Sequence, residues 1–155
     1  QKNIDDINYG VLLAEAYIYL EQFKQASAVL NSYQVGVKTP KRYWQLMLAI
    51  NEKNPDGKDA YSILEQWQKT NPYHIESSFL LANYWTNKKS PDRALRVLQK
   101  ANEKHPNNLM LHLVKMQVLL DNNRNSDAKS LFKELAQFEI NKDLLAGITG
   151  RILFV

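Results

Sequence analysis

The sequence predicts an all-α solenoid in which antiparallel helix hairpins stack side by side, with about nine helices. The first observation is a column of alanines at one fixed interval of 34 residues: Ala26, Ala60, Ala94 and Ala128. The second is that proline follows two of the expected hairpins at the same interval, at Pro72 and Pro106. The third is that only five glycines and five prolines occur in 155 residues, which leaves little room for a loop-rich fold. Self-similarity of this length is the signature of stacked supersecondary units.

Three further columns keep the same interval and predict the core. Four residues after the alanines lie Leu30, Leu64, Leu98 and Phe132. Three residues after them lie Val29, Ile63, Val97 and Leu131. Twelve residues before them lie Ala14, Leu48, Ala82 and Met116. The alanine column has a physical reason, because two helices of a hairpin approach closely only where a side chain is short. The repeats then fall at about 7–40, 41–74, 75–108 and 109–142.

The first two units follow from turn and capping residues. We expect the first hairpin at 8–20 and 22–33. In the second unit, Thr39 supplies a capping hydroxyl and Pro40 the first helical position. The composition of 54–57, Asn-Pro-Asp-Gly, predicts the turn of this hairpin.

The third and fourth units repeat this organisation. Ser90, Pro91 and Asp92 are expected to supply a cap, a first-turn proline and a first-turn acid. The fourth hairpin is expected at 107–121 and 126–138. Its turn, 122–125, is rich in asparagine, which tolerates left-handed backbone geometry.

The ends of the chain suggest a part of a longer array. Segment 1–7 is interpreted as the end of a preceding unit, and 143–155 as a terminal or fifth-repeat first helix. This last helix has little polar face, so an exposed apolar patch is expected there. One interpretation is that the array continues; the other is that two copies of the chain associate through 143–155.

The period and columns resemble the tetratricopeptide repeat (TPR) family, whose pattern is W-x2-L-G-x2-Y, then A-x3-F, then P. The residues that fit its opening are Leu13, Ala14 and Tyr17; Trp44, Met47 and Leu48; and Leu81, Ala82 and Trp85. The residues that depart from it are Asn51, Lys115, Lys38 and Ile140, so the fourth unit is the most degenerate. The resemblance covers about 8–141 and implies a right-handed superhelix. Its degenerate style is similar to bacterial TPR proteins of the cell envelope, including exopolysaccharide export.

The resemblance also implies a function, since the first helix of each TPR hairpin lines a concave wall that holds a peptide or helix of a partner protein. Counting from the buried columns places these residues on that wall: Val11, Glu15, Tyr19, Gln45, Phe79, Leu80, Asn83, Asn87, Met110, Leu113, Val114 and Gln117. Such a wall is apolar along its centre with amide and charged groups at its edges. Several of these aliphatics could instead pack between adjacent repeats. No cationic pair occupies the positions that TPR cochaperones use to bind an acidic tail.

Basic residues gather on one second helix, at Arg93, Arg96, Lys100 and Lys104. Such a stripe could bind phosphate backbones or an anionic surface, but the favoured interpretation is a solvated outer face. The net charge of +4 is mild, so no nucleic-acid partner is expected.

Nothing in the sequence points to catalysis, a cofactor or a metal. The chain has no cysteine, and its three histidines lie in different units without ligand spacing. No apolar run is long enough to span a bilayer. We therefore expect a soluble, non-enzymatic scaffold of the bacterial cytoplasm, periplasm or envelope.

Overall fold

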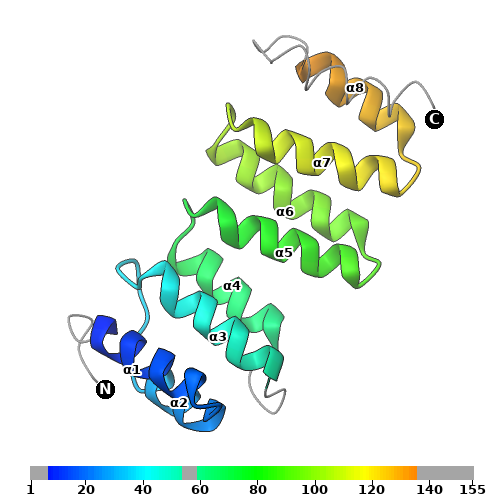
Figure 1. Cartoon of the computed structure of the whole chain (residues 1–155). Coiled ribbons are helices and arrows are strands. Elements are labelled where there is room, and N and C mark those ends of the chain that lie inside the picture. Colours follow the sequence, from blue (N-terminus) through cyan, green and yellow to red (C-terminus); the bar gives the residue numbers. More distant parts are fainter. Residues whose placement is uncertain (1–6, 54–58, 136–155) are drawn as a thin grey trace. The chain divides into compact units, whose positions relative to one another are not determined.

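The protein is all-α. The computed structural model describes residues 7–53 and 59–135, and this part folds into eight helices that pack mostly on their neighbours in sequence (Figure 1). The helices are α1 (Ile7–Tyr19), α2 (Phe23–Asn31), α3 (Lys41–Lys53), α4 (Ala60–Thr70), α5 (Ile75–Asn87), α6 (Pro91–Lys104), α7 (Leu109–Asp121) and α8 (Asn125–Leu135). The expected segment 1–6, the turn at 54–57 and the helix at 143–155 lie outside the described residues.

The helix bounds carry a regular period. The four odd-numbered helices have 13 residues each, and their first residues, Ile7, Lys41, Ile75 and Leu109, are 34 positions apart. The same interval separates the first residues of α6 and α8, Pro91 and Asn125. The fold is therefore all-α with sequential packing, and the bounds are consistent with a helical repeat.

Three hairpin turns share one geometry, and they are separated by two periods and by one period of 34 residues. Glu21, Lys89 and Asn123 have φ values of 56°, 54° and 57°. In each turn the next amide donates to the carbonyl five residues back, and the three bonds are Gln22 to Tyr17 at 2.8 Å, Ser90 to Trp85 at 2.9 Å and Arg124 to Leu119 at 2.9 Å. This is the Schellman helix ending. The left-handed geometry expected for the asparagine-rich turn is thus confirmed at Asn123.

Two capping predictions were wrong. The Ser90 hydroxyl makes no cap bond and instead donates to the Lys88 carbonyl at 3.4 Å, because Ser90 belongs to the preceding Schellman turn. The buried Thr39 hydroxyl accepts from the Gly36 amide at 2.8 Å, and α3 begins one residue after Pro40. The expected first-turn residues of α6, Pro91 and Asp92, are confirmed.

The chain divides into two compact units, Gln1–Ser77 and Ser78–Val155. In the first, the indoles of Trp44 and Trp67 are stacked, with centroids 6.3 Å apart and planes 8° from parallel. The Tyr43 ring meets Trp44 edge-on at 5.1 Å, and burial raises the pKa of Tyr43 to about 12. Stacked and edge-on aromatic pairs stabilise a core beyond the area that they bury.

The second unit has an aliphatic core. Its cluster consists of Met116, Leu119, Ala128, Leu131 and Leu135, with Leu95, Leu109, Leu120 and Phe132 packed against it. The predicted alanine column is fully buried at Ala26, Ala94 and Ala128, whereas Ala60 is only partly buried because it begins α4. Most of the column residues are therefore buried, but they make up less than half of the buried hydrophobic residues, and both stacked tryptophans lie outside the columns.

Candidate partner-binding surfaces

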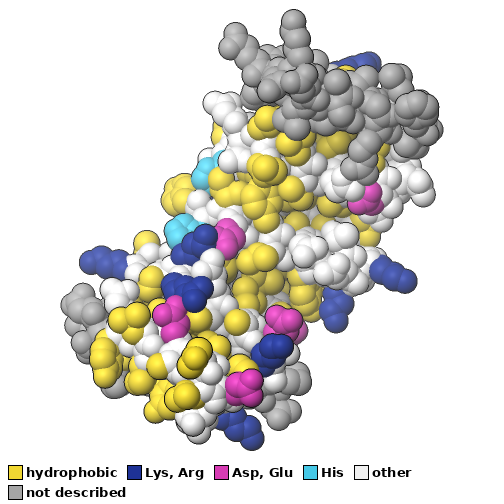
Figure 2. Space-filling view, viewed as in Figure 1, with side chains coloured by type: hydrophobic (Ala, Val, Ile, Leu, Met, Phe, Trp, Pro, Cys, Tyr) yellow, Lys and Arg dark blue, Asp and Glu magenta, His cyan; other side chains and the backbone are white. Residues whose placement is uncertain are grey.

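The helices differ in what they expose. The side chains that α4, α6 and α8 expose are all polar or charged, as expected for amphipathic helices with one face in the core. In contrast, α1 and α7 expose large apolar side chains: Tyr9 (66%), Leu12 (64%) and Tyr19 (88%) on α1, and Met110 (56%) on α7. Figure 2 shows hydrophobic side chains over both helices on the viewed face. Of these four residues, Tyr19 and Met110 belong to the predicted wall.

In the first unit, the predicted wall residues have different environments. Val11 is only 6% exposed and lies on the buried side of α1 with Ile7 and Ala14, so it belongs to the core. Tyr19, at the end of the same helix, projects into solvent. Within one helix, the sequence-based wall thus contains both a core residue and a surface residue.

Two polar wall residues of the first unit, Glu15 and Gln45, form hydrogen bonds with side chains of neighbouring helices. Arg42 Nε donates to Glu15 Oε1 at 2.5 Å, which links α3 to α1. Gln45 Nε2 donates to Glu76 Oε1 at 3.0 Å, and Lys41 forms an ion pair with the same carboxylate. Burial opposes ionisation of Glu76, but the hydrogen bonds from Lys41 and Gln45 and the Lys41 charge hold the pKa of Glu76 below its usual value. Both carboxylates therefore already have basic partners within the chain.

In the second unit, the predicted wall residues are accessible to different degrees. Those on α5 are Phe79 and Leu80, half-buried, and Asn83 and Asn87, exposed. Those on α7 are Leu113, Val114 and Gln117, half-buried, and Met110, exposed. Gln117 Nε2 donates to the Asp121 carboxylate at 2.6 and 2.5 Å. The result is an α7 surface that is largely apolar, with exposed amides on α5.

The predicted basic stripe on α6 consists of exposed side chains, but its members have different neighbours. The Arg93 guanidinium lies 4.5 Å from the ring centroid of Trp85, and Lys88 lies 5.6 Å from that of Tyr84. Trp85 is half-buried, and the Arg93 guanidinium covers part of its ring. Cation–π contacts of this kind stabilise the hairpin itself. Lys100 and Lys104 are exposed further along α6.

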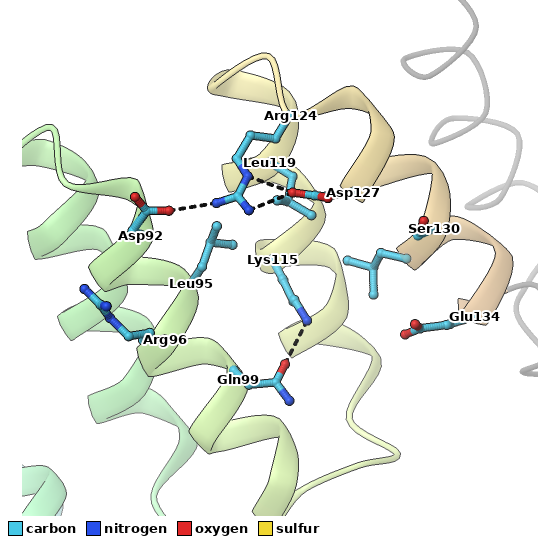
Figure 3. A pocket seen from close by; sticks show the side chains of 11 residues that line it. Asp92, Leu95, Arg96, Gln99, Lys115, Leu119, Arg124, Asp127, Ser130 and Glu134 are labelled. Atoms are coloured by element: carbon cyan, nitrogen blue, oxygen red, sulfur yellow. Dashed lines mark hydrogen bonds and ion pairs between the residues drawn. The ribbon is translucent and has the colours of Figure 1, made fainter.

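A pocket between α6, α7 and α8 was not predicted. It has a volume of about 570 Å³ and is lined by Asp92, Leu95, Arg96, Gln99, Lys115, Leu119, Arg124, Asp127, Ser130, Leu131 and Glu134 (Figure 3). Of the predicted site residues, only Arg96 lines it. Lys115, which replaces an expected core leucine, lines the pocket with its ammonium donating to Gln99 at 2.9 Å. Sequence columns did not reveal this pocket because its walls come from three helices.

Three of the six charged residues in this pocket form ion pairs with one another. Arg124 bridges two acids, with Nη1 2.8 Å from Asp92 and Nη2 2.7 Å from Asp127. The Lys115 ammonium is bonded to Gln99, and Leu95 and Leu119 lie between these polar contacts (Figure 3). Because the lining holds three acids and three bases, it does not favour a ligand of one charge sign.

Groups that could support catalysis are sparse in the described residues. His112 is buried on α7, with Nδ1 3.4 Å from the Asn108 carbonyl. Burial lowers the pKa of His112, the Lys115 charge lowers it further, and the Glu134 charge opposes this. Within 7–53 and 59–135, no group of three or more potential ligands could hold a metal ion, and no helix is long and apolar enough to cross a membrane.

Comparison with known proteins identified no relative: no protein-family model matches the chain, and no curated protein or solved structure has a significant match.

Proposed function

We propose that the hairpins form a right-handed solenoid of the TPR type, and that the chain is a non-enzymatic scaffold. In this proposal, the first helices of the second unit, α5 and α7, bind an apolar peptide or helix of a partner protein. The observation that carries it is the contrast between helices: α7 exposes Met110 and leaves Leu113 and Val114 partly exposed, whereas α4, α6 and α8 expose only polar side chains.

The α7 helix has apolar residues on two faces. Its inward residues Leu111, Met116 and Leu119 are buried, as the core requires. The same helix carries Met110, Leu113 and Val114 at positions that keep part of their surface in water. A surface helix normally needs only one apolar face. Covering the second face would stabilise a complex by roughly 25 cal/mol for each Å² of apolar area removed from water.

The charge pattern supports an apolar partner with few charges. Glu15 is paired with Arg42, and Asp121 accepts from Gln117, so these acids already have partners. The exposed amides of Asn83 and Asn87 on α5 offer both donors and acceptors. We therefore propose that the partner contributes apolar side chains to α7 and backbone or amide groups to α5.

The test is an affinity capture from a lysate of the source organism with the chain and two variants. Met110→Asp adds a charge to the exposed apolar face without entering the core. Ser126→Asp is the matched control, because it adds the same charge at an exposed position in the first turn of α8, where an acid is tolerated. A partner lost with Met110→Asp and retained with Ser126→Asp supports the proposal. A partner retained by both variants, with helicity unchanged, contradicts it.

A further inference from the structure

The outer face of α1 is an apolar surface that the core of the first unit does not use. Tyr9, Leu12, Tyr19 and Leu20 are 66%, 64%, 88% and 60% exposed, and the small Ala16 is exposed between them. The opposite side of the helix carries the buried Ile7, Val11 and Ala14. With 3.6 residues per turn, positions 9, 12, 16 and 19 lie on one side of a helix. The exposed residues therefore form one continuous stripe, which we name the α1 stripe: Tyr9, Leu12, Ala16 and Tyr19.

This stripe carries no charge. The only ionisable acid or base within α1 is Glu15, and its carboxylate is bonded to Arg42 of α3. A neutral face meets an identical neutral face without the like-charge repulsion that opposes most contacts between copies of one chain. Tyrosine is also enriched at protein interfaces, because its ring is apolar and its hydroxyl remains hydrogen-bonded at the rim.

We propose that two copies of the chain associate by packing their α1 stripes antiparallel about a two-fold axis. The spacing of the stripe is symmetric about position 14. An antiparallel pair in that register places Tyr9 against Tyr19 of the second copy, and Leu12 against Ala16 of the second copy. Each contact occurs twice, as a two-fold interface requires. The large Leu12 side chain lies over the small Ala16, which permits close helix approach, and the helix dipoles are opposed.

The size of the stripe determines the strength of this association. Tyr9 and Tyr19 bury roughly 200 Å² each when fully covered, and Leu12 and Leu20 bury less. Allowing for what the monomer already covers, full coverage of these four side chains on both copies removes at most on the order of 1,000 Å² in total, which is the lower limit for a specific interface. The expected dimer is therefore weak and reversible, and it forms at high protein concentration.

The first test is the mass of the chain in solution, measured by sedimentation over a wide concentration range. As the protein concentration rises, the measured mass is expected to increase from that of a monomer to that of a dimer. Leu12→Lys places two ammonium groups near the two-fold axis and is expected to weaken dimerisation by about tenfold or more. Val37→Lys is the matched control, since Val37 is 79% exposed and lies outside α1. Circular dichroism checks that both variants keep their helicity.

Two results would overturn the proposal. One is a chain that stays monomeric at every concentration. The other is a dimer that survives Leu12→Lys but is lost when 143–155 are deleted, because the second copy would then be held by the C-terminal segment. Neither result depends on the partner surface of α7, since Met110 lies in the other unit.

The register has its own test, because the chain contains no cysteine and single cysteines can be introduced cleanly. Leu12→Cys and Ala16→Cys chains, oxidised as a mixture, are expected to form mainly the mixed disulfide. Each variant oxidised alone is expected to cross-link poorly, because an antiparallel pair separates identical positions. Efficient cross-linking of each variant with itself indicates a parallel pair and overturns the proposed register.

Discussion

The Tyr33 ring lies directly against the backbone of α1 at Gly10. A Cβ placed on Gly10 would come within 2.5 Å of Tyr33 Cζ and 2.8 Å of its Oη, distances that real side chains do not adopt. Tyr33 is 6% exposed and follows α2. Gly10 therefore acts through its lack of a side chain, and it determines how closely the end of the first hairpin packs on its own first helix.

Gly10→Ala is expected to destabilise the first unit by about 1–3 kcal/mol, the usual cost of overpacking. This is opposite to the effect of helix propensity, which alone would favour alanine over glycine by about 1 kcal/mol. Urea unfolding followed by circular dichroism measures the difference. In a Tyr33→Leu background the clash is removed, so the same alanine should be neutral or stabilising. An equal loss in both backgrounds would show that the Tyr33 contact is not the cause.

The hairpin turns contain two residues that are poorly suited to their backbone. Glu21 and Lys89 adopt φ values of 56° and 54°, where a side chain costs about 1 kcal/mol relative to glycine. Glu21→Gly and Lys89→Gly are each expected to stabilise the chain by roughly 0.5–1 kcal/mol. Asn123→Gly should gain less, because asparagine already tolerates this geometry. Thermal unfolding of the three variants checks this order, and a loss of stability at both Glu21 and Lys89 would contradict it.

Asn71 connects two turns that are one period apart. Its buried side chain donates from Nδ2 to the Val37 carbonyl at 2.8 Å, across 34 positions of sequence. Asn71→Ala is expected to cost about 1 kcal/mol, the usual net contribution of a partly buried hydrogen bond. Asn71→Asp should cost more at neutral pH, since a carboxylate would face that carbonyl. Denaturant unfolding at pH 7 compares the two variants, and an aspartate that is better tolerated than alanine would contradict the role assigned to the amide.

Helical period was the part of the fold that the sequence predicted well. Residues that face the core must recur at a fixed spacing when identical units stack, so Ala26, Ala94 and Ala128 could be placed in the core without any structure. Capping was predicted less well. The hydroxyls of Thr39 and Ser90 have several nearby backbone partners, and turn geometry decides which one they bond.

Surface residues were harder to predict for a related reason. Counting from a buried column gives the direction of a side chain around its helix, but not how close the next helix lies. Val11 and Met110 were both placed on the predicted wall, yet the first is buried and the second is 56% exposed. The pocket lined by Lys115 and Glu134 depends on three helices meeting, which no single repeat encodes.

His112 is expected to make the stability of the chain depend on pH. Burial of its ring, with the Lys115 charge nearby, lowers its pKa below the ordinary 6.5, although Glu134 opposes the shift. Above pH 6.5 both the folded and the unfolded chain hold this histidine neutral, so its contribution is fully present. As pH falls below 6.5, the unfolded chain binds a proton more readily than the folded chain, and the free energy of unfolding decreases until the folded pKa is passed.

Urea unfolding between pH 8 and pH 5 measures this slope, and His112→Gln is expected to reduce it. Two further variants test the cause of the shift, because they should change the pKa of His112 in opposite directions. Lys115→Gln removes a repelling cation, so it should raise the pKa of His112 and flatten the slope. Glu134→Gln removes an attracting anion, so it should lower the pKa and steepen the slope. Titration of the His112 ring by NMR should give the highest pKa in Lys115→Gln and the lowest in Glu134→Gln. A pKa at or above 6.5 in the folded chain would show that the buried ring is not held neutral.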